Sequence, residues 1–126
     1  MSTRRTVTIH TVDHGPVTIP EPSWCAGRHR DGGARVDITH VGPEQPLTLP
    51  TRDGPAVHLV ASLESRPFVH DTFLRGPFMD IEIDGDHYPT GLAGLERMAD
   101  TLAAHADALR DRARELAVIL AGGEPR

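Results

Sequence analysis

The residues best suited to chemistry lie in one short stretch, between Pro20 and His40, of this 126-residue chain. Cys25 and His29 are separated by three residues, a common spacing for two zinc ligands because one turn of chain brings both side chains to the same side. His40 follows eleven residues later. One thiolate and two imidazoles form a ligand set that zinc favours. The sequence therefore predicts a zinc site that contains Cys25, His29 and His40.

A structural zinc site needs a fourth ligand. Glu21 is the nearest one, because it precedes Cys25 by the same four-residue step that separates Cys25 from His29. His14 and Asp37 are the alternatives. The ligand count separates two functions. Four protein ligands form a closed structural site, whereas three ligands and a water would permit a small zinc hydrolase with Glu21 as general base.

The segment that would hold this ion has little else to order it. Between Trp24 and Val36 it contains almost no core-forming residues, and its glycines include Gly27, Gly32 and Gly33. Such a segment cannot order itself by burial of apolar surface. A bound ion would order it, because metal-binding energy becomes folding energy. The alternative is a metal-free scaffold in which Cys25 is only a small buried apolar residue.

No other set of residues predicts catalysis. The chain has no G-x-S-x-G sequence, and it has no Lys to complete a phosphate-binding loop. Cys25, His40 and Asp37 could be drawn as a triad, but residue types without geometry do not establish one. Arg28 and Arg30 beside His29 could attract an anion to the loop. We therefore expect a non-enzymatic binding or regulatory module.

Composition narrows the class of partner and the location. The formal net charge is −5, which makes the chain a poor counterion for nucleic acid or an anionic membrane. A single Cys excludes an intrachain disulfide, a four-Cys zinc site and an iron–sulfur cluster. No apolar run approaches the roughly 20 residues of a membrane helix, and Met1–Arg5 lacks a signal-peptide core. We expect a soluble, cytoplasmic protein.

Proline divides the chain into two regions. Ten of the eleven prolines lie between Pro16 and Pro89, and none lies between Thr90 and Gly122. Because proline stops helices and confines strands to short runs, residues 6–89 should form strands and turns and residues 90–122 one helix. The prediction is a single domain, 1–126, with an α+β fold. An antiparallel sheet of about five to six short strands would be covered by one long C-terminal helix.

Alternating apolar residues predict the individual strands. These are a hairpin of Thr6–Val12 and Val17–Ile19, then Val36–His40, an edge strand Leu47–Leu49, Val57–Leu63, and Phe78–Ile83 with a turn at Asp84–Gly85 into His87–Tyr88. Residues 65–77 are expected to form a loop. The alternation of the Phe78–Ile83 strand, continued to the next residue, places Asp80, Glu82 and Asp84 on a solvated face, which would offer an acidic patch to a basic partner.

The C-terminal helix is expected from about Gly91 to Ala121, with Thr90 as N-cap and Gly122–Gly123 as its stop. Its apolar positions alternate spacings of three and four, which forms a heptad seam. They are Leu92, Leu95, Ala99, Leu102, Ala106, Leu109, Ala113, Leu116 and Leu120. About 31 residues give a helix roughly 46 Å long, whereas a body of about 90 residues is only about 30 Å across. The overhanging end is therefore expected to contact a protein partner, most simply a second copy.

Three segments carry a resemblance to a known group of proteins. They are His14-Gly15, Glu21 to His29 (E-P-S-W-C-A-G-R-H) and Asp37 to Glu44 (D-I-T-H-V-G-P-E), and the Ala/Leu-rich helix follows them. With this helix, the chain resembles a family of small actinobacterial, Streptomyces-type proteins of unknown function. The resemblance implies that W-C-x-x-x-H and D-I-x-H-x-G-P recur, and that Cys25, His29 and His40 match the family's ligand positions. It also implies that some members carry a second Cys in place of Glu21. It implies no activity.

Overall fold

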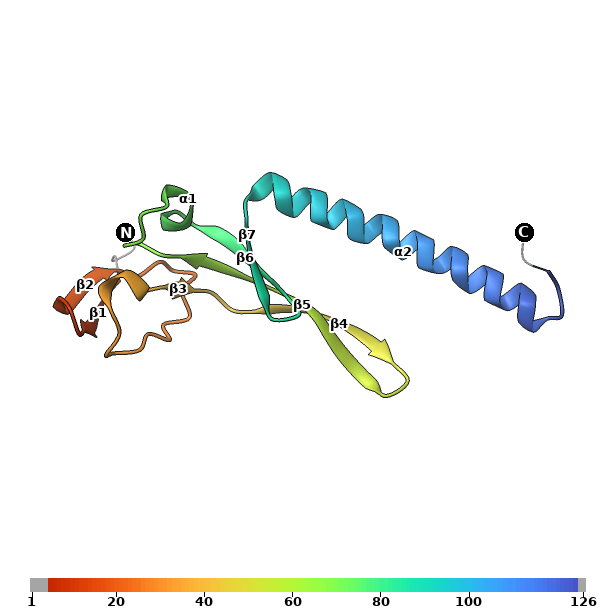
Figure 1. Ribbon diagram of the computed structural model, residues 1–126, viewed down its shortest axis with the longest axis horizontal. Helices are drawn as coiled ribbons and strands as arrows, with labels where there is room; N and C mark the ends of the chain where they lie inside the picture. The colour runs from red at the N-terminus through yellow and green to blue at the C-terminus, as the bar shows by residue number, and fades with distance from the viewer. Residues whose placement is uncertain (1–4, 125–126) are drawn as a thin grey trace. The chain divides into compact units, whose positions relative to one another are not determined.

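The computed structural model describes residues 5–124, which divide into two compact units after Gly91. The first unit contains seven antiparallel strands in two sheets, and the second is one long helix (Figure 1). The predicted α+β fold of antiparallel strands and one long C-terminal helix is confirmed. The structure has seven strands in two sheets, whereas the prediction was five to six strands in one sheet. The interpretation of 1–126 as one domain stays a prediction.

The described elements follow one another in this order: β1 (Thr6–Thr11), β2 (Gly15–Pro20), the 3-10 helix η1 (Arg35–Asp37), β3 (His40–Val41), β4 (Gln45–Thr51), β5 (Gly54–Ser65), the short helix α1 (Thr72–Arg75), β6 (Phe78–Ile83), β7 (Asp86–Thr90) and α2 (Leu92–Leu120). The long strand β5 organises the larger sheet, because β3, β4 and β6 all pair with it. β7 then pairs with β6. β4 pairs with β5 alone, which confirms its predicted place at an edge.

The N-terminal hairpin is confirmed in the predicted place. β1 and β2 pair antiparallel from Thr6 opposite Pro20 to Thr11 opposite Gly15, and Gly15 has a φ of 62°. The alternation of the two strands directs Ile9 and Ile19 to one side, where they are buried with Ile38. Val7, Val17 and Phe68 pack against this cluster. The hairpin therefore owes its core partly to residues far along the chain.

The predicted strand Val36–His40 is wrong over most of its length. Hydrogen bonds from Asp37 N to Ala34 O and from Ile38 N to Arg35 O form a 3-10 turn instead. Ile38 is buried in the hairpin core, whereas Val36 is exposed. Packing of Ile38 thus overrides the alternating pattern. Only His40 joins the larger sheet, opposite Ser65 in β5.

The expectation that Asp80 is solvated is also wrong. Asp80 is only 6% exposed, and its carboxylate accepts a hydrogen bond from the His87 ring over 2.8 Å. β6 lies between β5 and β7, and Asp80 is flanked across the sheet by Ser62 of β5 and Pro89 of β7. Glu82 is half-buried and Asp84 is exposed. The turn at Asp84–Gly85 is confirmed, and both residues have the positive φ that a two-residue hairpin turn requires.

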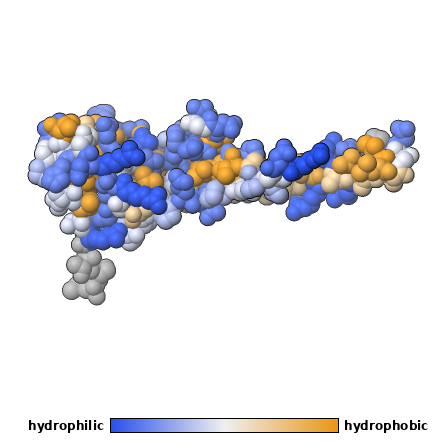
Figure 2. Space-filling view, turned by 90° about the horizontal axis from the view of Figure 1, so that it is seen from below, coloured by the Kyte–Doolittle hydropathy of each residue, from blue (hydrophilic) through white to orange (hydrophobic). Residues whose placement is uncertain are grey.

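The predicted long helix is confirmed as α2, which buries none of its residues. Its end is closed by Gly122, with a φ of 85°, and by a hydrogen bond from Gly123 N to Val118 O. Leu102, Leu109 and Leu116 of the seam are exposed. Figure 2 shows apolar residues gathered near the C-terminal end of this helix. Within residues 5–124, no helix combines the length and the apolarity needed to cross a membrane.

Candidate metal centre

Four side chains converge on one point in the first unit. Glu21, Cys25, His29 and His40 each offer one ligand atom, and these atoms all lie within 4.8 Å of one another. The cluster is therefore close enough to hold a metal ion. The structure brings together the four residues that the sequence singled out. The alternative fourth ligands, His14 and Asp37, lie outside the cluster. His14 pairs with Asp13 over 3.1 Å, and Asp37 is exposed at η1.

Three separate segments supply these side chains. Glu21 directly follows β2, and its N–H continues the hairpin pairing by donating to Arg5 O over 2.8 Å. Cys25 lies at a turn closed by its own N–H on Pro22 O, and the next residue, Ala26, donates to Val41 O. His40 begins β3. The site thus joins the end of the small sheet to an edge of the large one.

The Glu21 carboxylate is the hub of the cluster. Its Oε1 lies 2.8 Å from His40 Nδ1 and 3.0 Å from His29 Nε2. Cys25 Sγ lies 3.6 Å from the same His29 nitrogen. Ligand atoms around a tetrahedral zinc ion are about 3.4–3.6 Å apart, given the usual bond lengths. These three separations are 2.8–3.6 Å and all four ligand atoms lie within 4.8 Å of one another, so binding an ion would need side-chain shifts of up to about 1 Å.

The ligand side chains are almost completely removed from water. The side chains of Glu21 and His40 are each 5% exposed, and that of His29 is 8% exposed. The His29 and His40 rings meet edge to face with centroids 5.3 Å apart, and Trp24 and His40 form a second edge-to-face pair with centroids 6.4 Å apart. Rings held in this way have few alternative orientations. The cluster is therefore preorganised rather than assembled from mobile surface groups.

Burial and hydrogen bonding within the cluster together shift two pKa values. Burial by itself would raise the pKa of Glu21, but hydrogen bonds from Cys25, His29 and His40 outweigh it and lower the pKa below its ordinary value. Burial raises the pKa of the Cys25 thiol, and its hydrogen bond to Glu21 adds to this effect. A thiolate, a carboxylate and two neutral imidazoles would carry two negative charges. This donor set matches a divalent cation.

The structure also shows what sequence reasoning missed. His87 contacts Asp80, and its Nε2 lies 3.6 Å from Glu82. Glu82 and His87 are directly opposite each other across β6 and β7. That pairing follows from the two-residue turn, so the turn itself was the signal. The triad drawn from Cys25, His40 and Asp37 does not form, because Asp37 is outside the cluster.

Comparison with known proteins supports the resemblance in its general form. Residues 6–118 match a family described as a domain of unknown function, DUF6907. No curated protein and no solved structure matches the chain. The actinobacterial source and the recurrence of the two motifs stay predictions. Because the match covers most of the chain, the protein belongs to the DUF6907 family.

Proposed function

We propose that the protein is a non-enzymatic binding module whose loop, residues 21–42, is held together by a structural zinc ion. The observation that supports this most strongly is the convergence of four buried protein ligands on one point. Four ligands complete the tetrahedral coordination that zinc adopts in structural sites. Zinc is preferred over magnesium or calcium because sulfur and imidazole are soft ligands. The proposal includes a cytoplasmic location and no nucleic-acid partner.

A zinc ion would order a loop that has little regular structure of its own. Residues 26–34 form no helix or strand. Long-range backbone hydrogen bonds tie this segment down at only a few points, such as Gly32 N to His10 O. A fixed Cys25 and a fixed His29 would anchor it from inside. The ion would therefore contribute to folding in place of the missing apolar core.

The rival function is a zinc hydrolase in which Glu21 acts as base on a zinc-bound water. Its carboxylate contacts both histidine nitrogens within 3.0 Å, which favours a place among the ligands rather than behind a water molecule. The second rival is a metal-free scaffold in which the same four groups satisfy one another by hydrogen bonding alone.

Elemental analysis of protein purified without a His-tag tests the proposal. We expect about one zinc per chain, lost in the Cys25→Ser variant. His14→Gln is the matched control, because His14 is exposed and outside the cluster; it should retain zinc. Wild-type protein without metal would support the scaffold. Zinc-dependent turnover of ester or phosphoester substrates would support the hydrolase.

We further propose that α2 pairs with a second copy of the chain in antiparallel orientation. The seam has Ala99, Ala106 and Ala113 in one row and leucines in the other. With two antiparallel helices centred near residue 104, Ala99 would face Leu109 of the second copy, so that small and large side chains interdigitate. A parallel pair would instead place alanine against alanine and leucine against leucine.

Charges beside the seam favour the same arrangement. Glu96 and Arg110 both occupy the position directly after a seam leucine. In an antiparallel pair these positions face each other, so Glu96 of each copy would meet Arg110 of the other. A parallel pair brings His105 towards Arg110 and gives Glu96 no cationic partner. The charge pattern therefore supports the proposed antiparallel pairing with a second copy.

A further inference from the structure

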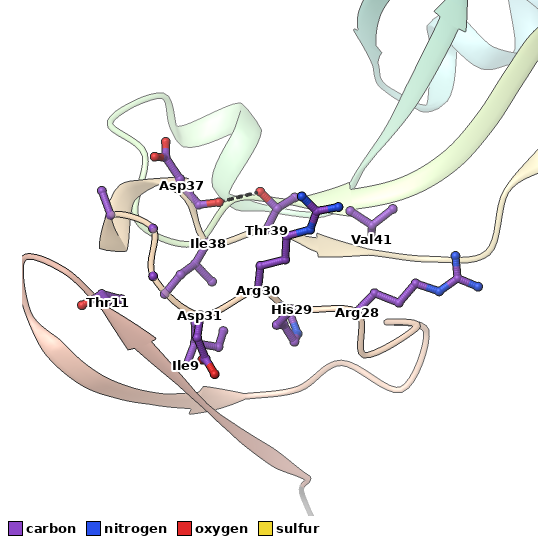
Figure 3. Close-up of a pocket in the computed structure, with 13 residues that line it drawn as sticks. Ile9, Thr11, Arg28, His29, Arg30, Asp31, Asp37, Ile38, Thr39 and Val41 are labelled. Atoms are coloured by element: carbon purple, nitrogen blue, oxygen red, sulfur yellow. Dashed lines mark hydrogen bonds between the residues drawn. The ribbon is translucent and has the colours of Figure 1, made fainter.

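A cavity of about 500 Å³ lies beside the metal centre (Figure 3). Its apolar side is formed by Ile9 and Ile38 of the hairpin core and by Val41. The segment from Arg28 to Ala34 forms the opposite wall, and Thr39 also lines the cavity. Sites for small molecules commonly measure about 300–1,000 Å³ and combine apolar surface with a few polar groups. This cavity has that size and that composition.

The acidic and basic side chains around the cavity differ in whether they already have a partner. Asp31 accepts a hydrogen bond from His10 N over 2.9 Å, so its carboxylate is tied to β1. Figure 3 shows the Asp37 carboxylate turned away from the other side chains that line the cavity. Arg28 and Arg30 extend on the side of Thr39 and Val41. Within residues 5–124, neither arginine takes part in an ion pair.

We propose that this cavity binds a small molecule with an apolar body and a carboxylate or phosphate group. The apolar body would lie against Val41 and against the small parts of Ile9 and Ile38 that line the cavity, the rest of both isoleucines being buried in the hairpin core. The anionic group would be held by Arg28 and Arg30, because a guanidinium donates two parallel hydrogen bonds to a carboxylate or phosphate. The chain's net charge of −5 disfavours anions in general, so binding of this group depends on the two arginines, which take part in no ion pair within the described residues.

His29 connects this cavity to the metal centre. Its ring contacts Glu21 and Cys25, while its sequence neighbours Arg28 and Arg30 line the cavity. An ion that fixes His29 would also fix the backbone that carries both arginines. This step rests on the proposed function, and it makes ligand binding depend on zinc. The metal-held loop would then position the arginines for ligand binding as well as stabilise the fold.

The test uses the full-length, zinc-loaded chain with phenylphosphate and benzoate as probes and benzyl alcohol as the uncharged comparison. Binding is followed by amide NMR shifts of residues 28–34. We expect saturable shifts with phenylphosphate, and affinity at least about tenfold weaker for benzyl alcohol. The Arg28→Gln/Arg30→Gln variant should lose at least about tenfold in affinity for phenylphosphate. Arg52→Gln, in the turn between β4 and β5, should bind like the wild type.

The same samples separate this inference from the metal proposal. Bound zinc without saturable shifts from either anion would overturn the anion site and leave the metal centre standing. Arginine-dependent phenylphosphate binding in a protein that takes up no zinc would overturn the metal centre and the dependence of binding on zinc, and leave the anion site standing. Equal affinity for inorganic phosphate and phenylphosphate would refute the role given to Ile9 and Ile38.

Discussion

The Glu21 carboxylate and the His40 ring meet over 2.8 Å although nineteen positions separate them in the chain. Glu21 follows the hairpin β1–β2, and His40 opens β3 in the larger sheet. Their contact therefore ties the two sheets together through buried polar groups. Buried polar groups are costly unless each is partnered, so the cluster is a point where one substitution should have large consequences.

Replacing Glu21 by Gln separates the two metal-dependent functions. The amide keeps the size of the side chain but removes its negative charge. If Glu21 is a ligand, zinc affinity should fall by at least about tenfold, measured by competition with a chromophoric chelator. The hydrolase makes the opposite prediction, because a general base is not a ligand. Unchanged zinc affinity in Glu21→Gln would therefore exclude a four-ligand site.

Removal of zinc should loosen the loop more than the sheet. Chelation removes the anchors at Cys25 and His29, so amide hydrogen exchange should accelerate at Ala26 and Gly32, which donate to Val41 O and His10 O. Amides that join β6 to β7 serve as the internal control and should keep their protection. Equal acceleration in both places would mean that the ion supports the whole unit rather than the loop.

The sequence singled out three of the four clustered residues because their spacing is local. Cys25 and His29 lie one turn of chain apart, and Glu21 lies one further step away. His40 was singled out as the end of a predicted strand, Val36–His40. The observed strand β3 begins only at His40, so most of that reasoning was wrong. Ile38 shows why: its place in the hairpin core depends on contacts with Ile9 and Ile19, which no pattern within residues 36–40 encodes.

The cavity was beyond the reach of the sequence. It draws residues from β1, the loop, η1 and β3, and these elements meet only in the folded unit. Asp80 shows a related limit. Alternation assigned it to solvent, but enclosure of β6 between two strands and the contact with His87 bury it. Local periodicity predicts which face a side chain occupies, and the neighbouring strands determine whether that face is exposed.

Gly42 is closely approached by neighbouring residues, so a side chain there should be destabilising. A Cβ at this position would lie 3.1 Å from Trp24 O and 3.4 Å from Leu63 Cβ, and the Gly42 N–H donates to Leu63 O. We expect Gly42→Ala to lower the free energy of unfolding by about 1–3 kcal/mol through overpacking. Gly33→Ala is the matched control, because a Cβ there would meet open space. Urea denaturation measures both, and equal stability of the two variants would contradict the close approach.

His87 should make stability depend on pH. Its hydrogen bond to Asp80, together with the attraction of that carboxylate, raises the pKa of His87 above its ordinary value. The protonated form is therefore favoured by folding. This contribution is fully present below the unfolded pKa of about 6.5 and is lost as the pH rises through the folded pKa.

The His87→Gln variant should remove this pH dependence. Its urea midpoint should fall relative to the wild type at about pH 5.5, and the difference should be smaller at about pH 8.5. His105→Gln on α2 serves as the control and should show no such change between the two pH values. A deficit in His87→Gln that is independent of pH would show that the ring acts by packing alone.

Charge reversal on α2 tests both the partner and its orientation. In the antiparallel pair, position 96 of each copy faces position 110 of the other. Glu96→Arg alone would therefore put two arginines opposite each other at both contacts, and Arg110→Glu alone would put two glutamates there. Each single variant should shift the sedimenting species from the mass of two chains towards one. The double variant Glu96→Arg/Arg110→Glu restores opposite charges and should recover the pair. A parallel pair would respond weakly to reversal at Glu96, and a wild-type mass of one chain at micromolar concentration would contradict pairing altogether.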